Sequence, residues 1–128
     1  MTEPRFLLDT NICIYVLADA ESLAAKRVEE CEEGSAVASA ITYAELLRGI
    51  RSAGPEDEAK LESFFQHVPV MPFGELQAEA YAGLPFRRGS FDRLIAAHAL
   101  SLGLILVTNN IRDFADVSGL QLENWAKP

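Results

Sequence analysis

The fold is decided by Phe6-Leu7-Leu8-Asp9-Thr10-Asn11, near the start of the chain. Residues 5–8 have the apolar character of a buried strand, and residues 11–17 are predicted to form a short helix capped by Thr10 or Asn11. Aspartate is disfavoured in strands, so Asp9 at the end of this run favours a functional role over a structural one.

The rest of the chain repeats this alternation of strand and helix. Further strands are predicted over residues 36–40, 68–71, 104–107 and 120–122. Helices are predicted over 22–33, from Thr42 to Gly54, from Pro55 onward, over 75–82 and over 90–102. The pattern predicts an α/β fold: a three-layer α/β/α domain whose central parallel sheet has about five short strands. The chain shows no repeat or linker, so residues 1–128 are expected to form one domain.

The composition of the chain bears on its cellular location and on the state of its cysteines. No apolar stretch approaches the roughly 20 residues that a membrane span requires. The start of the chain has no basic leader, so a cytoplasmic location is expected. Cys13 and Cys31 lack a second pair or a nearby histidine, which favours buried free thiols over a zinc site or a disulfide.

The chain carries a formal charge of −8, from 11 basic and 19 acidic residues. Nucleic-acid binding usually leaves a basic footprint, so this balance argues against such a partner. A divalent metal site concentrates negative charge, however, and the arginines here are clustered. The acidic surplus also suits a basic protein partner.

Acidic residues recur where predicted elements begin or end. They are Asp9 after the first strand, Glu45 after the second, Asp92 at the start of a long apolar helix, and Asp113 after the fourth strand. If the first, second and fourth strands are neighbours, these groups converge at the carboxyl ends of a parallel sheet. Oxygen ligands without histidine or thiolate select Mg²⁺ or Mn²⁺, which supports phosphodiester hydrolysis.

Each acid also has a structural interpretation. Thr42 and Glu45 have the spacing of a capping box. The negative charge of Asp92 could simply stabilise the positive N-terminal end of its helix. Asn110 and Asp113 could cap the turn that ends at Phe114. His98, on the same apolar helix as Asp92, is expected to be a hydrogen-bonded core residue and not a base.

Four motifs in order resemble the PIN domain, and more narrowly the VapC toxins of type II toxin–antitoxin pairs. They are Leu7-Leu8-Asp9-Thr10-Asn11, Ala40-Ile41-Thr42-x-x-Glu45-Leu46, Phe91-Asp92-x-Leu94-Ile95-Ala96-Ala97-His98-Ala99 and Leu106-Val107-Thr108-Asn109-Asn110-x-x-Asp113-Phe114. The resemblance implies an endoribonuclease whose acids bind Mg²⁺ or Mn²⁺ and which cuts a structured RNA, often a transfer RNA, to halt translation. A housekeeping PIN nuclease, a phosphatase-like or receiver-type domain and a non-catalytic protein on the same scaffold are the alternatives.

By this resemblance, Asp9 and Asp92 match the principal metal ligands and Glu45 the second acid. Asp113 is favoured over Asn110 for the fourth position, as a direct or water-mediated ligand, with Asn110 orienting water or substrate. Thr10, Asn11 and Thr108 would support the carboxylates. The segment from Leu84 to Gly89 is shorter than expected for the family, which bears on substrate contacts more than on chemistry.

Partners follow from the same resemblance. Such toxins form homodimers and are inhibited by a VapB antitoxin whose tail covers the cleft and places an arginine among the acids. DNA binding would belong to the antitoxin, and no membrane is involved.

Overall fold

Strands and helices alternate along the computed structural model, which describes residues 2–51, 53–88 and 90–128. The strands are β1 (Phe6–Leu8), β2 (Ala36–Ser39), β3 (Val70–Met71), β4 (Ile105–Val107) and β5 (Leu122–Glu123). The helices are α1 (Thr10–Ala18), α2 (Leu23–Glu30), α3 (Ala40–Gly49), α4 (Pro55–His67), α5 (Glu75–Ala82) and α6 (Asp92–Leu102), with a 3₁₀ turn η1 (Ile111–Phe114).

The five strands form one parallel sheet in the order β3-β2-β1-β4-β5. The centre is β1, in which Leu7 lies beside Val37 of β2 and Leu106 of β4. The predicted parallel sheet of about five strands is therefore confirmed, as is the adjacency of the first, second and fourth strands. The carboxyl ends of these three strands lie at one edge of the sheet.

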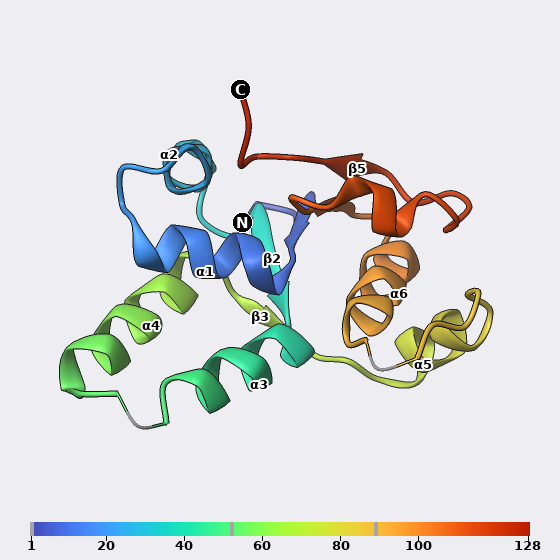
Figure 1. Ribbon diagram of the computed structural model, residues 1–128, viewed down its shortest axis with the longest axis horizontal. Coiled ribbons are helices and arrows are strands. Elements are labelled where there is room, and N and C mark those ends of the chain that lie inside the picture. Colours follow the sequence, from blue (N-terminus) through green and yellow to red (C-terminus); the bar gives the residue numbers. More distant parts are fainter. Residues whose placement is uncertain (1, 52, 89) are drawn as a thin grey trace.

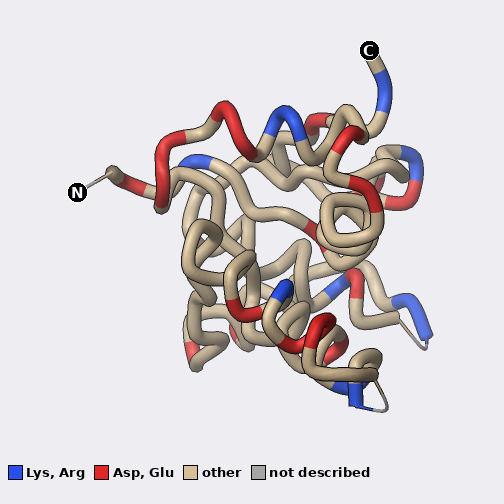
Figure 2. The backbone as a smooth tube through the Cα atoms, turned by 90° about the vertical axis from the view of Figure 1, so that its left-hand side faces the viewer, with Lys and Arg blue, Asp and Glu red and all other residues tan. Residues whose placement is uncertain are grey.

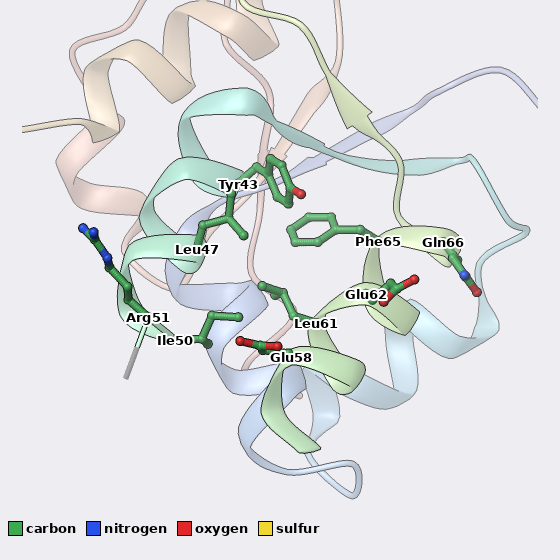
Figure 3. Close-up of a pocket in the computed structure, with 9 residues that line it drawn as sticks. All are labelled: Tyr43, Leu47, Ile50, Arg51, Glu58, Leu61, Glu62, Phe65 and Gln66. Atoms are coloured by element: carbon green, nitrogen blue, oxygen red, sulfur yellow. The ribbon is translucent and has the colours of Figure 1, made fainter. Parts of the chain in front are cut away.

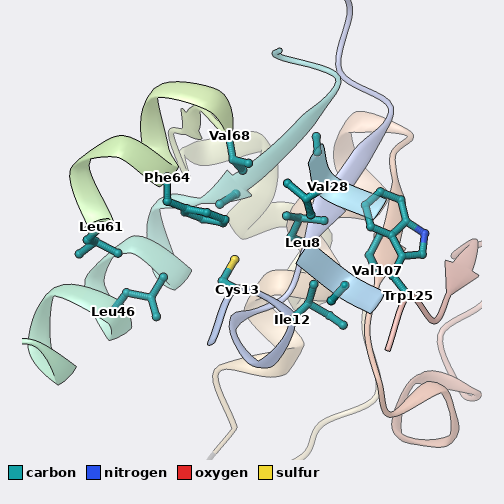
Figure 4. Packing of buried hydrophobic residues seen from close by; sticks show 13 residues of the cluster. Leu8, Ile12, Cys13, Val28, Leu46, Leu61, Phe64, Val68, Val107 and Trp125 are labelled. Carbon is teal, nitrogen blue, oxygen red and sulfur yellow. The ribbon is translucent and has the colours of Figure 1, made fainter. Parts of the chain in front are cut away.

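Successive side chains of a strand point to opposite faces, so each face of the sheet has its own core. Leu8 and Val107 pack against α1, α2, α3 and α4 in the cluster of Figure 4. Leu7 and Leu106 pack against α6 on the other face. Figure 1 shows α1 to α4 on one side of the sheet and α5 and α6 on the other. The three-layer α/β/α prediction is confirmed.

Two helix starts differ from the predictions. The N-cap of α1 is Asp9, whose side chain accepts a hydrogen bond from the Ile12 amide, and not Thr10 or Asn11. Helix α3 begins at Ala40, because Ser39 accepts from the Ile41 amide. Thr42 lies two residues inside this helix and is therefore not its cap. The capping box proposed for Thr42 and Glu45 does not form.

Two helix ends also fall earlier than predicted: α2 ends at Glu30 and α3 at Gly49. By contrast, α6 stops as expected at Gly103, whose φ of 67° is the left-handed conformation that favours glycine.

Cys13 is buried, Cys31 is partly buried, and both thiols are free. No helix within the described ranges is long and apolar enough to span a membrane.

Candidate active site

Three carboxylates from three separate elements approach one another at the carboxyl edge of the sheet. Asp9 follows β1 directly, and Asp92 is the first residue of α6. Glu45 lies in the second turn of α3 and not immediately after β2, because α3 already begins at Ala40. The negative charges of Asp92 and Glu45 both raise the pKa of Asp9, so the three groups lie within electrostatic range. Residues far apart in the sequence thus contribute to one acidic cluster.

Asp9 is the most constrained member of this cluster. Its side chain is only 4 % exposed, its amide donates to the Val107 carbonyl at 2.9 Å, and its Oδ1 accepts from the Ile12 amide at 2.9 Å. Burial raises the pKa of Asp9 to about 6, against the opposing effect of hydrogen bonds from Thr108 and Ile12. The fold therefore holds this carboxyl in a position that disfavours its negative charge.

Glu45 is oriented by a chain of two buried hydroxyls. Thr10 Oγ1 donates to Glu45 Oε1 at 2.7 Å and lies 3.0 Å from Thr42 Oγ1. Since a hydroxyl has a single proton, Thr42 must be the donor to Thr10. Sequence reasoning missed this role of Thr42, although a threonine three residues before Glu45 on the same helix face was a usable signal.

Asp92 and Asp113 form the other half of the site. Burial, followed by the charge of Asp113, raises the pKa of the half-buried Asp92, while Arg93 lowers it. Asp113 is exposed in η1, and its Oδ2 accepts a hydrogen bond from Asn110 Nδ2. Asp113 is therefore within electrostatic range of Asp92, whereas the charges that raise the pKa of Asp9 are those of Asp92 and Glu45.

The remaining predicted residues divide into buried and exposed. Thr108 is fully buried, and its Oγ1 accepts from the Asn110 amide at 3.1 Å while its hydroxyl supports Asp9. Asn11 is exposed on the first turn of α1, and Asn110 is exposed beside Asp113. The two asparagines are thus accessible to a substrate, whereas Thr10 and Thr108 act through the carboxylates.

Two further residues brace the site and escaped sequence reasoning. Arg93 is 2 % exposed, and its Nη2 donates to the Asp113 carbonyl at 3.0 Å and to Asp116 Oδ1 at 2.7 Å. Ser39, the cap of α3, lies 2.8 Å from Nδ1 of His98. His98 is fully buried and burial lowers its pKa, so it is the expected core residue.

A family model described as "PIN domain" matches residues 6–120 of the chain. The "tRNA(fMet)-specific endonuclease VapC" of Shigella flexneri is 38% identical over 133 residues, covering 95% of this chain and 98% of its own. The chain belongs to the VapC family of PIN-domain proteins. The motifs that carried the resemblance are therefore family motifs, placed by the fold around one acidic cluster.

Solved structures of VapC proteins share this fold. The DNA-bound VapBC complex of Salmonella typhimurium matches with a TM-score of 0.82 and 32% identity, over 95% of this chain and 98% of that chain. The VapBC2 complex of Rickettsia felis, bound to a DNA fragment from its promoter, matches with a TM-score of 0.80 and 27% identity, over 97% and 99%. Both comparisons span essentially the whole chain.

The donors of this VapC-family site suit a hard divalent cation. They are carboxylate oxygens; burial first, and then repulsion from neighbouring carboxylates, raises the pKa of Asp9 and Asp92, and a bound cation offsets both effects. None of the ion pairs within the described ranges involves Asp9, Glu45, Asp92 or Asp113. In the same ranges, no three acidic, histidine or cysteine side chains are close enough to form a complete metal-binding group. Water molecules would therefore have to complete the coordination shell.

An apolar groove runs between α3 and α4, on the helix that carries Glu45 (Figure 3). Its volume is about 770 Å³. Tyr43 and Phe65 meet edge to face within it, with ring centroids 4.9 Å apart, and Leu47 is 43 % exposed. Glu58 and Glu62 of α4 supply carboxylates to the lining. An apolar groove with acidic residues in its wall suits an amphipathic, basic segment.

Proposed function

We propose that the chain is a divalent-metal-dependent endoribonuclease, the toxin of a toxin–antitoxin pair, which hydrolyses phosphodiester bonds in a structured RNA. The observation that carries this proposal is the placement of the buried Asp9 at the carboxyl edge of the sheet, within electrostatic range of Glu45 and Asp92 from two other elements. Burial, and secondarily the charges of Asp92 and Glu45, raises the pKa of Asp9 to about 6. Perturbed carboxyls that converge in this way are typical of a catalytic site. Membership of the VapC family supports the same conclusion.

Asp9, Glu45 and Asp92 would bind Mg²⁺ or Mn²⁺ together, at least one of them through water because no three such side chains in the described ranges lie close enough to ligate one ion directly. Asp113 would be a direct or water-mediated fourth ligand. When bound, such a cation activates water and offsets the charge that develops on the phosphate. The buried hydroxyls of Thr10 and Thr108 fix the directions of Glu45 and Asp9, as outer partners of metal ligands commonly do. Hydrolysis adds the oxygen of water to phosphorus and breaks one P–O bond of the RNA chain.

Exposed amides provide the contacts that the carboxylates cannot. Asn110, held beside Asp113, would orient the attacking water or a phosphate oxygen. Asn11, exposed at the start of α1, would contact the RNA backbone. Both side chains donate and accept hydrogen bonds, so they add polar contacts without adding charge to the cluster.

A transfer RNA is the proposed substrate class, because the Shigella flexneri relative is named for cleavage of tRNA(fMet). The direct test incubates the protein with initiator and elongator methionine tRNAs in Mn²⁺, Mg²⁺ or EDTA. We expect discrete fragments of one tRNA that require metal. Cleavage that persists in EDTA would contradict the metal-dependent mechanism.

Variants of the acidic cluster complete the test. Asp9→Asn and Asp92→Asn remove one charge each and should abolish cleavage with the fold intact. Asp57→Asn, in the first turn of α4, is the matched control because Asp57 lies outside the cluster. If Asp9→Asn and Asp92→Asn cut as fast as Asp57→Asn, the assignment is wrong.

We also propose that the groove between α3 and α4 receives the apolar face of a VapB-type antitoxin. Tyr43, Leu47 and Phe65 would contact that face, and Glu58 and Glu62 would pair with its basic residues. Because α3 carries both Glu45 and the groove, a segment seated there can extend to the acidic cluster. Expression of the chain should arrest growth, and co-expression of the antitoxin encoded beside its gene should relieve the arrest.

Assembly is proposed on the same basis. The chain would form a homodimer, and DNA would be bound only through the antitoxin, in keeping with the DNA-bound VapBC complexes among its structural relatives. Light scattering on the isolated chain should give twice the mass of 14.0 kDa. The isolated chain should leave its promoter DNA unshifted in a gel, and the complex with antitoxin should retard it.

A further inference from the structure

Two phenylalanines in the segment that leads into Asp92 are unusually exposed. Phe86 is 78 % exposed and Phe91 is 58 % exposed, whereas a large aromatic side chain ordinarily buries most of its surface. Both lie in the segment between α5 and α6, and Phe91 directly precedes Asp92. Exposed apolar surface next to a catalytic candidate indicates a contact with another molecule.

The exposure of these rings is not caused by a detached segment. Leu84 packs against the cluster on the α6 face of the sheet, and its amide donates to the Tyr81 carbonyl at 3.0 Å. Arg87 pairs with Asp116 at 3.6 Å, and Ser90 Oγ accepts from the Asp92 amide at 3.0 Å. The segment is thus attached to α5, to the loop after η1 and to α6, and the rings face outward from an anchored backbone.

Positive charge accompanies the rings. Arg88 is exposed and takes part in none of the ion pairs within the described ranges, and Arg112 is exposed on η1 beside Asp113. Figure 2 shows acidic stretches distributed over much of the backbone, with basic residues in short separate groups. Although the chain has a formal charge of −8, the segment between the two exposed rings thus carries an exposed arginine without a carboxylate partner among the ion pairs of the described ranges.

We propose that Phe86, Arg88 and Phe91, here termed the aromatic rim, bind unpaired nucleotides of the RNA next to the cleaved bond. Bases would stack on the two rings, and the guanidinium of Arg88 would meet a phosphate. Aromatic faces combined with positive charge are the usual means of holding single-stranded nucleic acid, and stacking does not depend on base identity. This inference rests on the proposed function and adds the part of the RNA that the site recognises.

The same rim is too small to hold a second copy of the chain by itself. A stable interface buries about 800 Å² per partner, whereas an aromatic side chain contributes about 150–250 Å². An exposed arginine in the segment that leads into Asp92 also fits a polyanion that reaches the acidic cluster. RNA is therefore the occupant that the chemistry favours.

Binding is measured separately from cleavage, in the Asp9→Asn background with a fluorescent RNA hairpin whose loop is unpaired. Replacing Phe86 and Phe91 with Leu keeps apolar surface but removes stacking, and should weaken binding about tenfold to a hundredfold. Replacing both with Trp should restore the parental affinity. Leu23→Ala, an exposed apolar site on α2, is the matched control and should bind like the parent.

The charge of the rim is tested by salt. Arg88→Gln should lower the slope of log affinity against log salt by about one, the change expected for one lost phosphate contact. In the cleaving protein, the Leu variant should raise KM with little change in kcat, because stacking holds the substrate and leaves the acids untouched.

Three outcomes would overturn the inference. The first is that the Leu variant binds the hairpin as tightly as the parent, and the second is that its affinity for a fully paired duplex without a loop falls as much as its affinity for the hairpin. The third is a change of oligomeric mass with RNA affinity intact, which would make the rim a contact between copies of the chain. A chain that binds the hairpin through the rim yet cuts no RNA would uphold the inference and defeat the proposed function. A chain that cuts RNA equally well without the rings would do the reverse.

Discussion

The hydroxyl of Thr10 donates to Oε1 of Glu45 at 2.7 Å, across 35 positions of sequence. This bond ties the first turn of α1, whose N-cap is Asp9, to the second turn of α3. Glu45 is thereby held by the residue that directly follows Asp9 in the chain. The Thr42 hydroxyl, which donates to Thr10, extends the bond into the interior.

Thr10→Val should disturb Glu45 while keeping the shape of residue 10. The variant removes the donor to Glu45 and the acceptor of Thr42, both in buried surroundings, at a cost of about 1–3 kcal/mol. Outer partners of metal ligands typically affect affinity or activity by about 10–100-fold, so RNA cleavage should fall within that range. Thr10→Ser retains the hydroxyl and should recover most of the rate. Equal activity of the Val and Ser variants would show that the bond is irrelevant to catalysis.

Asp9 has a structural and a proposed chemical role, and two variants separate them. Asn is as good an N-cap as Asp, so Asp9→Asn should unfold at or above the parental temperature once the repulsion among the acids is reduced. Asp9→Ala loses the cap and should be about 1 kcal/mol less stable than Asp9→Asn. Both variants should lose more activity than the roughly 10–100-fold expected for an outer partner. Thermal melting and tRNA cleavage, measured in parallel, give the two answers.

Stability should depend on pH through Asp9 in metal-free protein. Burial raises the pKa of this carboxyl from 3.8 to about 6, so the folded state holds its proton more tightly than the unfolded state does. Its contribution to stability is therefore complete below pH 4 and is lost as the pH rises to about 6, a difference of roughly 3 kcal/mol. Urea unfolding in EDTA at several pH values should show this decline. The decline should be smaller in Asp9→Asn, which keeps only the contribution of Asp92, whose pKa is also raised by burial.

Bound divalent metal should offset the loss of stability that metal-free protein shows as the pH rises. Metal binding requires the deprotonated carboxylate, so the rise in melting temperature caused by Mn²⁺ should be larger at pH 7.5 than at pH 5. Proton release measured by calorimetry in buffers of different ionisation enthalpy should be greatest near pH 5. A metal effect that is independent of pH between 5 and 7.5 would separate Asp9 from the metal site.

Leu47→Glu should weaken antitoxin binding without affecting cleavage. Leu47 is 43 % exposed on α3, and glutamate is a good helix former, so the fold should tolerate the change. Loss of a buried leucine contact, worth about 1.5–3 kcal/mol, corresponds to roughly 10–100-fold in affinity. Leu23→Glu on α2 is the matched control, since Leu23 lies outside the groove. Calorimetric titration with the antitoxin would show whether only the groove variant loses affinity.

Arg93→Met should loosen the contact between α6 and η1. The variant removes the donor to the Asp113 carbonyl and to Asp116, so Asp113 is no longer fixed relative to Asp92. We expect a lower melting temperature and a higher Mn²⁺ concentration for half-maximal cleavage. Asp116→Asn keeps the bond to Asp113 and should shift the Mn²⁺ requirement less. An unchanged Mn²⁺ requirement in Arg93→Met would remove Asp113 from the metal site.

Local patterns were sufficient to predict the layers and most elements. The apolar strands, the glycine that ends α6 and the Pro55 start of α4 are encoded within a few residues of each event. The two misplaced helix starts have a different cause. Ser39 and Thr42 are both good caps by type, and the pairing of Ala38 with Leu8 and Val70 determines where β2 ends and which of them is used. Strand pairing is a long-range property that a local pattern does not contain.

The acidic residues of the candidate site were identified from local patterns. Asp9 and Asp92 stand at the border of an element, whereas Glu45 lies inside α3, and the convergence of the three depends on β1 lying between β2 and β4. The Thr42–Thr10–Glu45 chain and the Arg93 brace were missed because each joins segments 20 or more residues apart. Such cross-links depend on how elements pack, and a single sequence gives little indication of them.

The two edges of the sheet restrict how any regulator can attach. Strands β3 and β5 contain two residues each, so an extended peptide would find very few free backbone amides and carbonyls with which to continue the sheet. Recognition by β-augmentation is thereby disfavoured, and a helix lying on helices is the geometry that remains. The short edges also give the monomer little template for amyloid-like stacking with other copies of the chain.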